Sequence, residues 1–521
     1  RLWLLHRVDP SASMHHLVFV HRLGRDIDLG ALRYALADVV QRHAVLRTVF
    51  PMDEAGPTRR SFPWTSTCVP STRRRVRRGR GIRAPTLPPG VGYPLRVQLW
   101  AEADGDHVLA AVVHHIALDG GSMDRLATDL ETAYTARRGG HEPRWAPLPV
   151  DYADYSVWLR EVLGDPAGPG SVARTQLDYW TQVLDGIDGP IALPTDRPRP
   201  AQPSHQGATI ERTLDAEVRQ RLSDVARSQG VTVFMVLHAA LAVLLSREGG
   251  TPTSSQGPPL PDDPTPHSTL VGMFVGTVAL RTEVNSATSF AALLEQVRTV
   301  DLDAFAHADV PFDDVVARVA PRRSTSYNPL FQVMLAYQHT APQPVGLPGT
   351  GIESAGSGTA TAEFDLVWDF TESAGELTLR LLYATDLFGD STAQALAQRF
   401  DRILDAALTD PSEVVGDIDI LEAGERAALV SGPARNYQPK TVAEIFETQV
   451  RATPHAVAVE ETGVQWTYEE LDDVAERWAR ALSDRGVGPE DVVAVATGRG
   501  RHWVAAVWAV AKAGAVWLSL D

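Results

Sequence analysis

Cysteine and lysine are nearly absent from the sequence, and each shortage limits what the protein can do. Cys68 is the only cysteine among 521 residues, so the chain can form no internal disulfide bond and no cluster of thiolate metal ligands. Lys440 and Lys512 are the only lysines, so arginine carries nearly all of the positive charge. With 36 prolines and 40 glycines, this composition is typical of a GC-rich bacterial genome, which is the origin we expect.

Net positive charge and long hydrophobic runs are also lacking. The net charge of −17 argues against nucleic acid as a partner, because phosphate binding requires a basic face. The most apolar stretch, residues 231–246, is shorter than the ~18–20 residues of a membrane span, so we interpret it as a buried core helix. The chain opens without a basic leader or signal-peptidase site. We therefore expect a cytoplasmic protein with no membrane partner.

A chain of 521 residues is too long for one ordinary core, so at least two globular units are expected. A proline-rich connector at 193–204 predicts the junction between an N-lobe of about 1–190 and a C-lobe of about 191–420. Residues 421–440 are polar and lack a sustained apolar period, which indicates a linker.

The pattern changes after the linker. Residues 441–521 alternate between helical and extended patterns, which is typical of a parallel α/β sheet. The alternation stops before such a domain is complete, and the chain begins at Arg1 without a methionine, so we expect a piece of a longer protein. The expected elements are helices over 442–451, 468–485 and 504–513 and strands over 456–460, 492–497 and 515–520.

Within the first 420 residues, a continuous apolar run at 108–113 predicts a strand buried on both faces. Ser122 can cap a following helix, which Gly139 and Gly140 end. We also expect a helix over 28–40, an extended segment over 45–50 and an exposed loop over 249–268.

The strongest chemical signal follows the strand at 108–113. His114 and His115 are adjacent imidazoles at its end, and Asp119 and Gly120 stand just before the helix. Neighbouring strand residues point to opposite faces, so only one imidazole can face a given cavity. A neutral imidazole accepts a proton near neutral pH, which suits acyl transfer to an amine. A pair of core histidines is the alternative. A metal site is disfavoured, because adjacent histidines diverge and no third ligand is evident.

The segment HHIALDG at residues 114–120 contains the pattern HHxxxDG. It resembles the signature of the condensation domains of nonribosomal peptide synthetases and of related acyltransferases with the chloramphenicol acetyltransferase-like fold. Six further segments resemble motifs of that family, in the family's order, over about 420 residues. They are RLWLL (1–5), RHAVLRTVF (42–50), DYADYSVW (151–158), VGMFVGTVALR (271–281), HADVPFD (307–313) and RSTSYNPL (323–330).

The tail resembles a second family. WTYEEL (466–471) and AKAGAVWLSLD (511–521) are similar to the first two signature segments of adenylation domains. The glycine-rich phosphate loop of that family would come later in the sequence. We therefore expect these residues not to activate an amino acid on their own.

The resemblance implies an α/β fold in which two chloramphenicol acetyltransferase-like lobes form a V around a tunnel, followed by an incomplete α/β N-terminal portion of an adenylation domain. It implies that the chain itself binds no cofactor. The phosphopantetheine arms of an upstream and a downstream peptidyl carrier domain would enter the tunnel from opposite faces. They would bring an acyl or peptidyl donor and an aminoacyl acceptor, whose condensation forms an amide bond. The remainder of the adenylation domain is the other expected partner.

The resemblance also implies roles for the motif residues, which form the predicted catalytic set. His115 would lie in the tunnel and accept the proton of the amine, whereas His114 would face inward and support the strand end. Asp119 would be structural and would pair with Arg281. Gly120 would let the backbone approach the oxyanion.

Five further positions carry expectations. Arg47 is expected to form a structural ion pair. The tunnel candidates are Gly121, Ser122, Gly276 and Asn328. Gly121 replaces a tryptophan of the family and Gly276 replaces an asparagine, so we expect a wider or less rigid tunnel.

Three segments refine the resemblance, and a fourth departs from it. HHIALDGGSM (114–123), AYTARRGG (133–140) and PLPVDYADY (147–155) resemble domains that accept a donor with a D-configured C-terminal residue. Residues 59–94 are rich in arginine, proline and glycine and resemble the family poorly. We interpret them as a solvated loop, with a carrier-docking patch and a local reading-frame error as alternatives.

Three rival functions share the fold. An epimerisation domain has a similar motif, but the adenylation-like sequence that begins after Lys440 argues against it. A heterocyclisation domain replaces both histidines by aspartates, so His114 and His115 exclude it. A degenerate condensation domain that only recruits partners stays open because of Gly121 and Gly276, although the intact HHxxxDG disfavours it.

Overall fold

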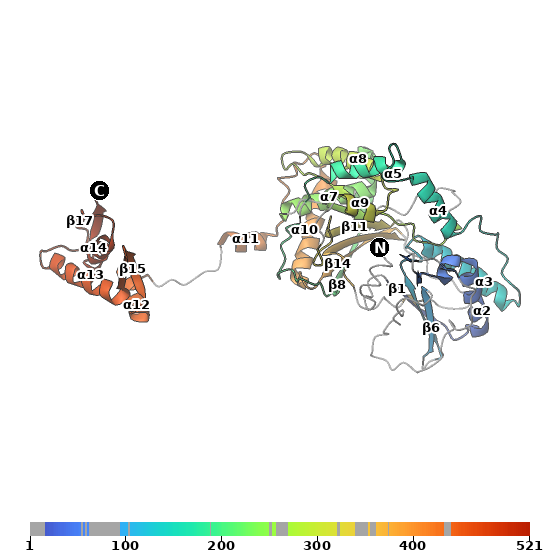
Figure 1. The fold of residues 1–521 in the computed structure, drawn as a ribbon, viewed down its shortest axis with the longest axis horizontal. Coiled ribbons are helices and arrows are strands. Elements are labelled where there is room, and N and C mark those ends of the chain that lie inside the picture. Colours follow the sequence, from blue (N-terminus) through green and yellow to red (C-terminus); the bar gives the residue numbers. More distant parts are fainter. Residues whose placement is uncertain are drawn as a thin grey trace. The chain divides into compact units, whose positions relative to one another are not determined.

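The computed structural model describes residues 16–53, 56–57, 60–61, 94–102, 105–187, 189–249, 253–256, 269–319, 324–338, 353–354, 361–373, 375–431 and 439–520. The chain divides into two compact units, residues 1–421 and 422–521, each of which is drawn in Figure 1. The motif at 1–5, Cys68, most of the arginine-rich segment 59–94 and most of the predicted loop at 249–268 lie outside the described residues.

The first lobe contains a four-stranded sheet with the order β12-β1-β7-β6. The central strand β7 (His107–His114) pairs antiparallel with β1 (His16–Leu23) on one side and with β6 (Leu95–Ala101) on the other. This confirms the strand that the apolar run at 108–113 predicts. The short strand β12 (Glu353–Ser354) comes from much later in the sequence and pairs with the far end of β1, so the two halves of the first unit are interleaved.

Two helices of the first lobe pack on one face of this sheet. They are α2 (Leu29–Arg42), which confirms the predicted helix, and α3 (Ser122–Arg138). Asp28 caps α2 by accepting the backbone N–H of Ala31 at 2.9 Å. The extended segment expected over 45–50 is wrong in its first half. Residues Ala44–Arg47 form a 3-10 helix. The prediction failed because Val45 and Leu46 are both buried, and an apolar run this short fits a helix as well as a strand.

Short strand pairs and three helices complete the connections of the first unit. β2 (Thr48–Val49) pairs with β5 (Arg60–Ser61), and β3 (Met52–Asp53) pairs with β4 (Gly56–Pro57). The chain then passes from α3 through α4 (Tyr152–Leu163) to α5 (Val172–Val183), as Figure 1 shows. The third helix is α9 (Phe312–Val319), which packs against α5.

The second lobe has its own four-stranded sheet, with the order β11-β13-β14-β8. The strands are β8 (Gly207–Leu214), β11 (Val333–Gln338), β13 (Leu366–Ser373) and β14 (Glu376–Ala384). Alternate residues on β13 and β14, such as Trp368 and Leu379, are fully buried. They belong to one core with the helices α6 (Ala216–Gln229), α7 (Val233–Arg247), α8 (Phe290–Ala306) and α10 (Asp390–Thr409).

Helix α7 is buried at every residue from Phe234 to Leu245, which confirms the predicted core helix. No single helix in the described ranges is long and apolar enough to cross a membrane, and α6 and α7 meet that measure only as a pair bent by 100°. The loop expected over 249–268 contains a strand, β9 (Thr253–Gln256), which pairs antiparallel with β10 (Thr277–Arg281). The polar Ser and Thr residues of β9 concealed this strand from the hydrophobic pattern.

The second unit begins with α11 (Ala423–Ser431), a helix within the segment 421–440 in which the sequence predicts a linker. A hairpin of β15 (Val457–Glu461) and β16 (Val464–Thr467) then precedes α13 (Tyr468–Ser483). β17 (Val492–Val495) and β18 (Val516–Ser519) pair in parallel across α14 (Arg501–Lys512), which confirms the predicted α/β alternation. The predicted helix over 442–451 is α12 (Val442–Ala452).

Candidate active site

The two adjacent histidines have different surroundings. His114 is the last residue of β7 and is 6% exposed. Its Nδ1 accepts the backbone N–H of Ile116 at 3.1 Å, and its ring packs edge-on against His16, the residue opposite it on β1. These contacts fix the imidazole of His114 within the fold.

His115 lies just beyond β7, in the turn before α3, and is partly buried. Its Nδ1 is buried and has no hydrogen-bond partner among the described residues. A neutral imidazole has one donor and one acceptor nitrogen, so the fold leaves a ring position of His115 unused. His115 is therefore the better candidate of the two for contact with a substrate.

Asp119 closes the turn that begins at His115, and its carboxylate is 2% exposed. Oδ1 accepts the backbone N–H of Ser122 at 3.0 Å and its hydroxyl at 2.8 Å. Oδ2 accepts the backbone N–H groups of Phe274 at 2.8 Å and Val275 at 3.0 Å. Every one of these partners is a backbone amide or a hydroxyl.

The ion pair expected between Asp119 and Arg281 is wrong. The guanidinium of Arg281 donates instead to the backbone oxygens of Val183 and Asp185, at 3.2 and 2.6 Å, at the end of α5. Asp119 contacts the segment before β10, whereas Arg281 is the last residue of that strand. Because a strand advances ~3.3 Å per residue, the two positions are too far apart to pair.

Ser122 joins the same contact and does not line an open space, because it is 2% exposed. Its hydroxyl lies 2.9 Å from the backbone oxygen of Gly272 and accepts the N–H of Gly272 at 3.1 Å. The backbone N–H of Asp119 donates to the same Gly272 oxygen at 3.1 Å. Ser122 is also the first residue of α3 and not its cap, which is Gly121.

Two of the predicted glycines, Gly120 and Gly276, have room around them. A Cβ at Gly120 would meet nothing within 4 Å, and a Cβ at Gly276 would meet only the backbone oxygen of Ala308 at 3.8 Å. Gly120 and Gly121 are exposed, and Gly121 has the ordinary helical dihedrals φ −65° and ψ −24°. Neither the backbone of Gly121 nor the surroundings of Gly120 therefore require glycine.

The other two predicted residues lie on separate segments of the chain. Asn328 is partly buried, and its Oδ1 is buried without a hydrogen-bond partner among the described residues. Its backbone oxygen accepts the side chain of Gln332 at 2.7 Å. Arg47 ends the 3-10 helix and donates to the backbone oxygen of Gln41 at 3.5 Å.

Sequence reasoning missed two groups that support the site. Tyr152 lies against Gly272, and Gly272 contacts the Asp119 turn. Their only sequence signal is their place in the two family-like segments. In the segment RHAVLRTVF, Arg42 and His43 bind the buried Asp129 of α3 at 3.1 and 2.7 Å. Burial alone would raise the pKa of Asp129, but the hydrogen bonds and charges of His43 and Arg42 lower it below its ordinary value.

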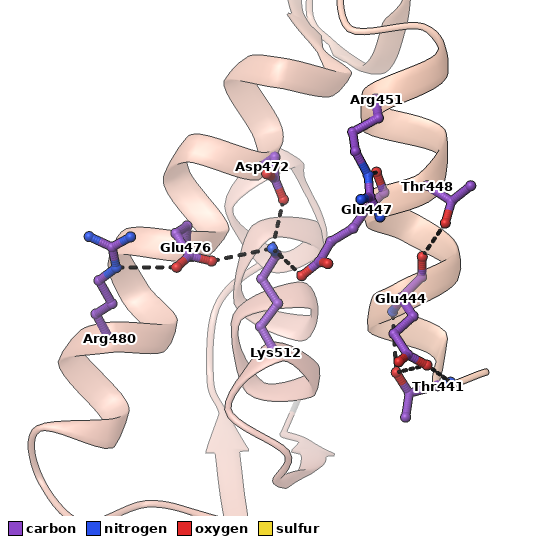
Figure 2. Close-up of polar contacts among 9 residues, drawn as sticks. All are labelled: Thr441, Glu444, Glu447, Thr448, Arg451, Asp472, Glu476, Arg480 and Lys512. Atoms are coloured by element: carbon purple, nitrogen blue, oxygen red, sulfur yellow. Dashed lines mark hydrogen bonds and ion pairs between the residues drawn. The ribbon is translucent and has the colours of Figure 1, made fainter.

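The second unit contains a separate ionic cluster, shown in Figure 2. The Nζ of Lys512 is paired with Asp472 at 2.9 Å, Glu447 at 3.0 Å and Glu476 at 3.3 Å, and its side chain is only 6% exposed. These residues join α12, α13 and α14. Among the described residues, no three His, Cys, Asp or Glu side chains lie together as metal ligands would.

Comparisons with known proteins identify the family of the chain. Residues 91–430 match the family described as Condensation domain, and residues 446–521 match AMP-binding enzymes. The chain therefore belongs to the condensation domain family. It carries the condensation domain of a nonribosomal peptide synthetase followed by part of an adenylation domain, as predicted.

Several relatives match the whole chain. Two of them are a probable non-canonical nonribosomal peptide synthetase, CymA, of Salinispora arenicola (strain CNS-205), at 40% identity, and a dimodular nonribosomal peptide synthase of Bacillus subtilis (strain 168), at 36% identity. The chain spans only 7% and 23% of their respective lengths.

Solved structures confirm the predicted fold class. The X-domain from teicoplanin biosynthesis is 32% identical with a TM-score of 0.71, over 81% of this chain and 96% of that one. The four-domain synthetase AB3403 has a TM-score of 0.76 at 18% identity, over 100% of this chain and 41% of that one, and shows the fold alone.

Proposed function

We propose that the first unit forms an amide bond between two carrier-bound thioesters. An upstream carrier supplies the acyl or peptidyl donor, and a downstream carrier supplies the aminoacyl acceptor. Family membership implies an amide-forming acyltransferase. The buried Nδ1 of His115, just beyond β7, has no hydrogen-bond partner in the described part of the chain and is the observation that supports this chemistry here.

The reaction needs little activation of the nucleophile. An α-amino group has a pKa near 8, so an appreciable fraction is neutral at cellular pH. Its nitrogen attacks the donor carbonyl, the new C–N bond forms and the C–S bond breaks. His115 accepts the amine proton as the tetrahedral intermediate forms, and the departing thiolate regains a proton to become the thiol. Holding both thioesters together supplies much of the rate, because effective molarities can reach ~10⁵ M.

Two finer features belong to the same proposal. The donor has a D-configured C-terminal residue, on the strength of the segments at 114–123, 133–140 and 147–155. The phosphopantetheine arms of the two carriers deliver the substrates, and the chain acts without a cofactor of its own.

The test is a condensation assay with donor and acceptor loaded on separate carrier domains that are added to the purified chain. Mass spectrometry of the acceptor carrier should detect the bound amide, and a donor ending in a D-residue should react faster than its L-epimer. An acceptor carrier loaded with an N-acetylated amino acid is the control, since it presents no nucleophile. Equal rates for the two epimers would refute the stereochemical part alone.

A recruitment module is the second candidate, and one observation favours it. A solved complex of the X-domain and OxyB from teicoplanin biosynthesis contains a domain 31% identical to this chain over 94% of that domain, with a TM-score of 0.70. A chain that binds loaded carriers or a partner enzyme but yields no amide would support recruitment instead of catalysis.

A further inference from the structure

We propose that Tyr152 is a positioning residue for the condensation reaction, acting on His115 through the segment Gly272–Val275 and the carboxylate of Asp119. The inference rests on the proposed function, because it assigns Tyr152 to the same site. It goes beyond the HHxxxDG motif, since Tyr152 belongs to neither the strand nor the turn that carries the histidines.

The segment Gly272–Val275 is held from one side by the turn that follows His115. The Asp119 carboxylate accepts the N–H groups of Phe274 and Val275, and the Ser122 hydroxyl accepts the N–H of Gly272. Three of its four backbone amides are therefore tied to the two polar side chains that close the active-site turn.

Tyr152 holds the same segment from α4. Its hydroxyl donates to the backbone oxygen of Met273 at 2.7 Å, and its ring packs edge-on against Phe274 with 5.2 Å between centroids. Tyr152 is the first residue of α4, and the capping box of Asp151 and Asp154 fixes the helix start at this position.

Gly272 shows how closely the ring approaches. A Cβ at Gly272 would lie 2.2 Å from Cδ2 and 2.7 Å from Cε2 of Tyr152, so no residue other than glycine fits while the ring stays in place. Atoms in ordinary contact lie ~3.5–4.0 Å apart. The ring of Tyr152 therefore covers the backbone of Gly272. The backbone oxygen of the same glycine accepts the N–H of Asp119.

These contacts form a continuous path. Tyr152 fixes the segment, the segment supplies two amides to Asp119, and Asp119 closes the turn that starts at His115. Removing the tyrosine hydroxyl frees the Met273 oxygen and lets the segment shift. This shift should misalign the His115 imidazole with the substrate amine and leave the affinity for the carriers unchanged.

The variant Tyr152→Phe tests this directly, because it keeps the ring over Gly272 and removes only the hydrogen bond. We expect kcat to fall about 2- to 10-fold, the range of one net hydrogen bond, with KM for both carriers unchanged. Tyr34→Phe is the matched control, because Tyr34 is 62% exposed on α2, and its kcat should equal that of the wild type.

A double-mutant cycle separates positioning from general packing. Ser122→Ala removes the hydroxyl on the opposite side of Gly272, so in Tyr152→Phe/Ser122→Ala the loss in kcat should be smaller than the product of the two single losses. Losses that multiply, or an unchanged kcat in a folded Tyr152→Phe, would overturn the inference.

Hydrogen exchange keeps the inference separable from the proposed function. The amides of Phe274 and Val275 should exchange faster in Tyr152→Phe than in the wild type, whether or not the chain forms amides. Absence of amide product in the wild type would refute the proposed function. Unchanged exchange at these two amides would refute the role of Tyr152.

Discussion

The carboxylate of Asp119 and the backbone N–H of Phe274 meet at 2.8 Å, although 155 residues separate them in the sequence. The same oxygen accepts Val275, so one carboxylate joins the end of the first-lobe turn to the chain that leads into β10. Hydrogen bonds to a charged acceptor contribute ~1.5–3 kcal/mol each, more than neutral ones. Among the described residues, the turn that carries His115 is thus held by amides and a hydroxyl and not by a cation.

Asp119→Ala should lower the free energy of unfolding of the first unit by about 3 kcal/mol, because it removes the buried carboxylate that accepts the amides of Ser122, Phe274 and Val275. Urea denaturation followed by tryptophan fluorescence measures the change. Arg281→Ala is the informative companion, since Arg281 shares no hydrogen-bond partner with Asp119 among the described residues. In the double variant the two losses of unfolding free energy should add within ~0.5 kcal/mol. A larger coupling energy would show that Asp119 and Arg281 interact after all.

His115→Ala should fold as the wild type does and form amide ~10²–10⁴-fold more slowly, as expected when a general base is removed. The rate is measured with saturating loaded carriers. His141→Ala serves as the control, because this histidine is exposed after the end of α3. A loss of less than tenfold would show that other groups position or deprotonate the amine.

The sequence predicted the elements whose hydrophobic period is long and regular. β7 and α7 are buried over most of their length, so their apolar runs are continuous, and the HHxxxDG pattern located the turn after β7 without structural information. The partners of Asp119 were not predictable in the same way. They are backbone amides, which every residue except proline has, so no side chain marks them.

Similar physical reasons explain the other misses. α11 has a weakly apolar sequence, and Leu429 and Val430 stay exposed on it, so no buried stripe signalled the helix. The close approach of Tyr152 to Gly272 depends on the meeting of segments 120 residues apart. Contacts of this kind follow from tertiary packing, and a glycine is their only sign in the sequence.

Gly121→Trp should reduce turnover of a bulky donor more than that of a small one. Gly121 is exposed with ordinary helical dihedrals, so its backbone accepts an indole without strain. The ratio of kcat/KM for the two donors measures the effect. Gly276→Asn is the companion variant, since an added Cβ there makes only an ordinary contact at 3.8 Å. An equal loss of kcat/KM for both donors in Gly121→Trp would show that the space beside Gly121 does not select the substrate.

Lys512→Met should destabilise the second unit by roughly 2 kcal/mol, because three carboxylates on α12 and α13 lose their shared cation while the methylene packing is retained. The carboxylates are 25–43% exposed, so water weakens the loss relative to a fully buried pair. Thermal unfolding of this unit at pH 7 measures the change. Lys440→Met is the control, because Lys440 is the only other lysine and is exposed.

The pH dependence of the Lys512 cluster follows from the same contacts. The hydrogen bond from Lys512 lowers the pKa of Glu476 despite partial burial, so this stabilisation is present above the ordinary glutamate range and is lost as the pH falls below about 4. Burial would lower the pKa of Lys512, but its bonds to Asp472 and Glu447 raise it, so its contribution persists until the pH exceeds about 10. The melting temperatures of the wild type and Lys512→Met should therefore differ most between about pH 5 and 10 and converge on acidification. A difference that stays constant from pH 7 to pH 3 would show that packing of the side chain, and not its charge, holds the three helices together.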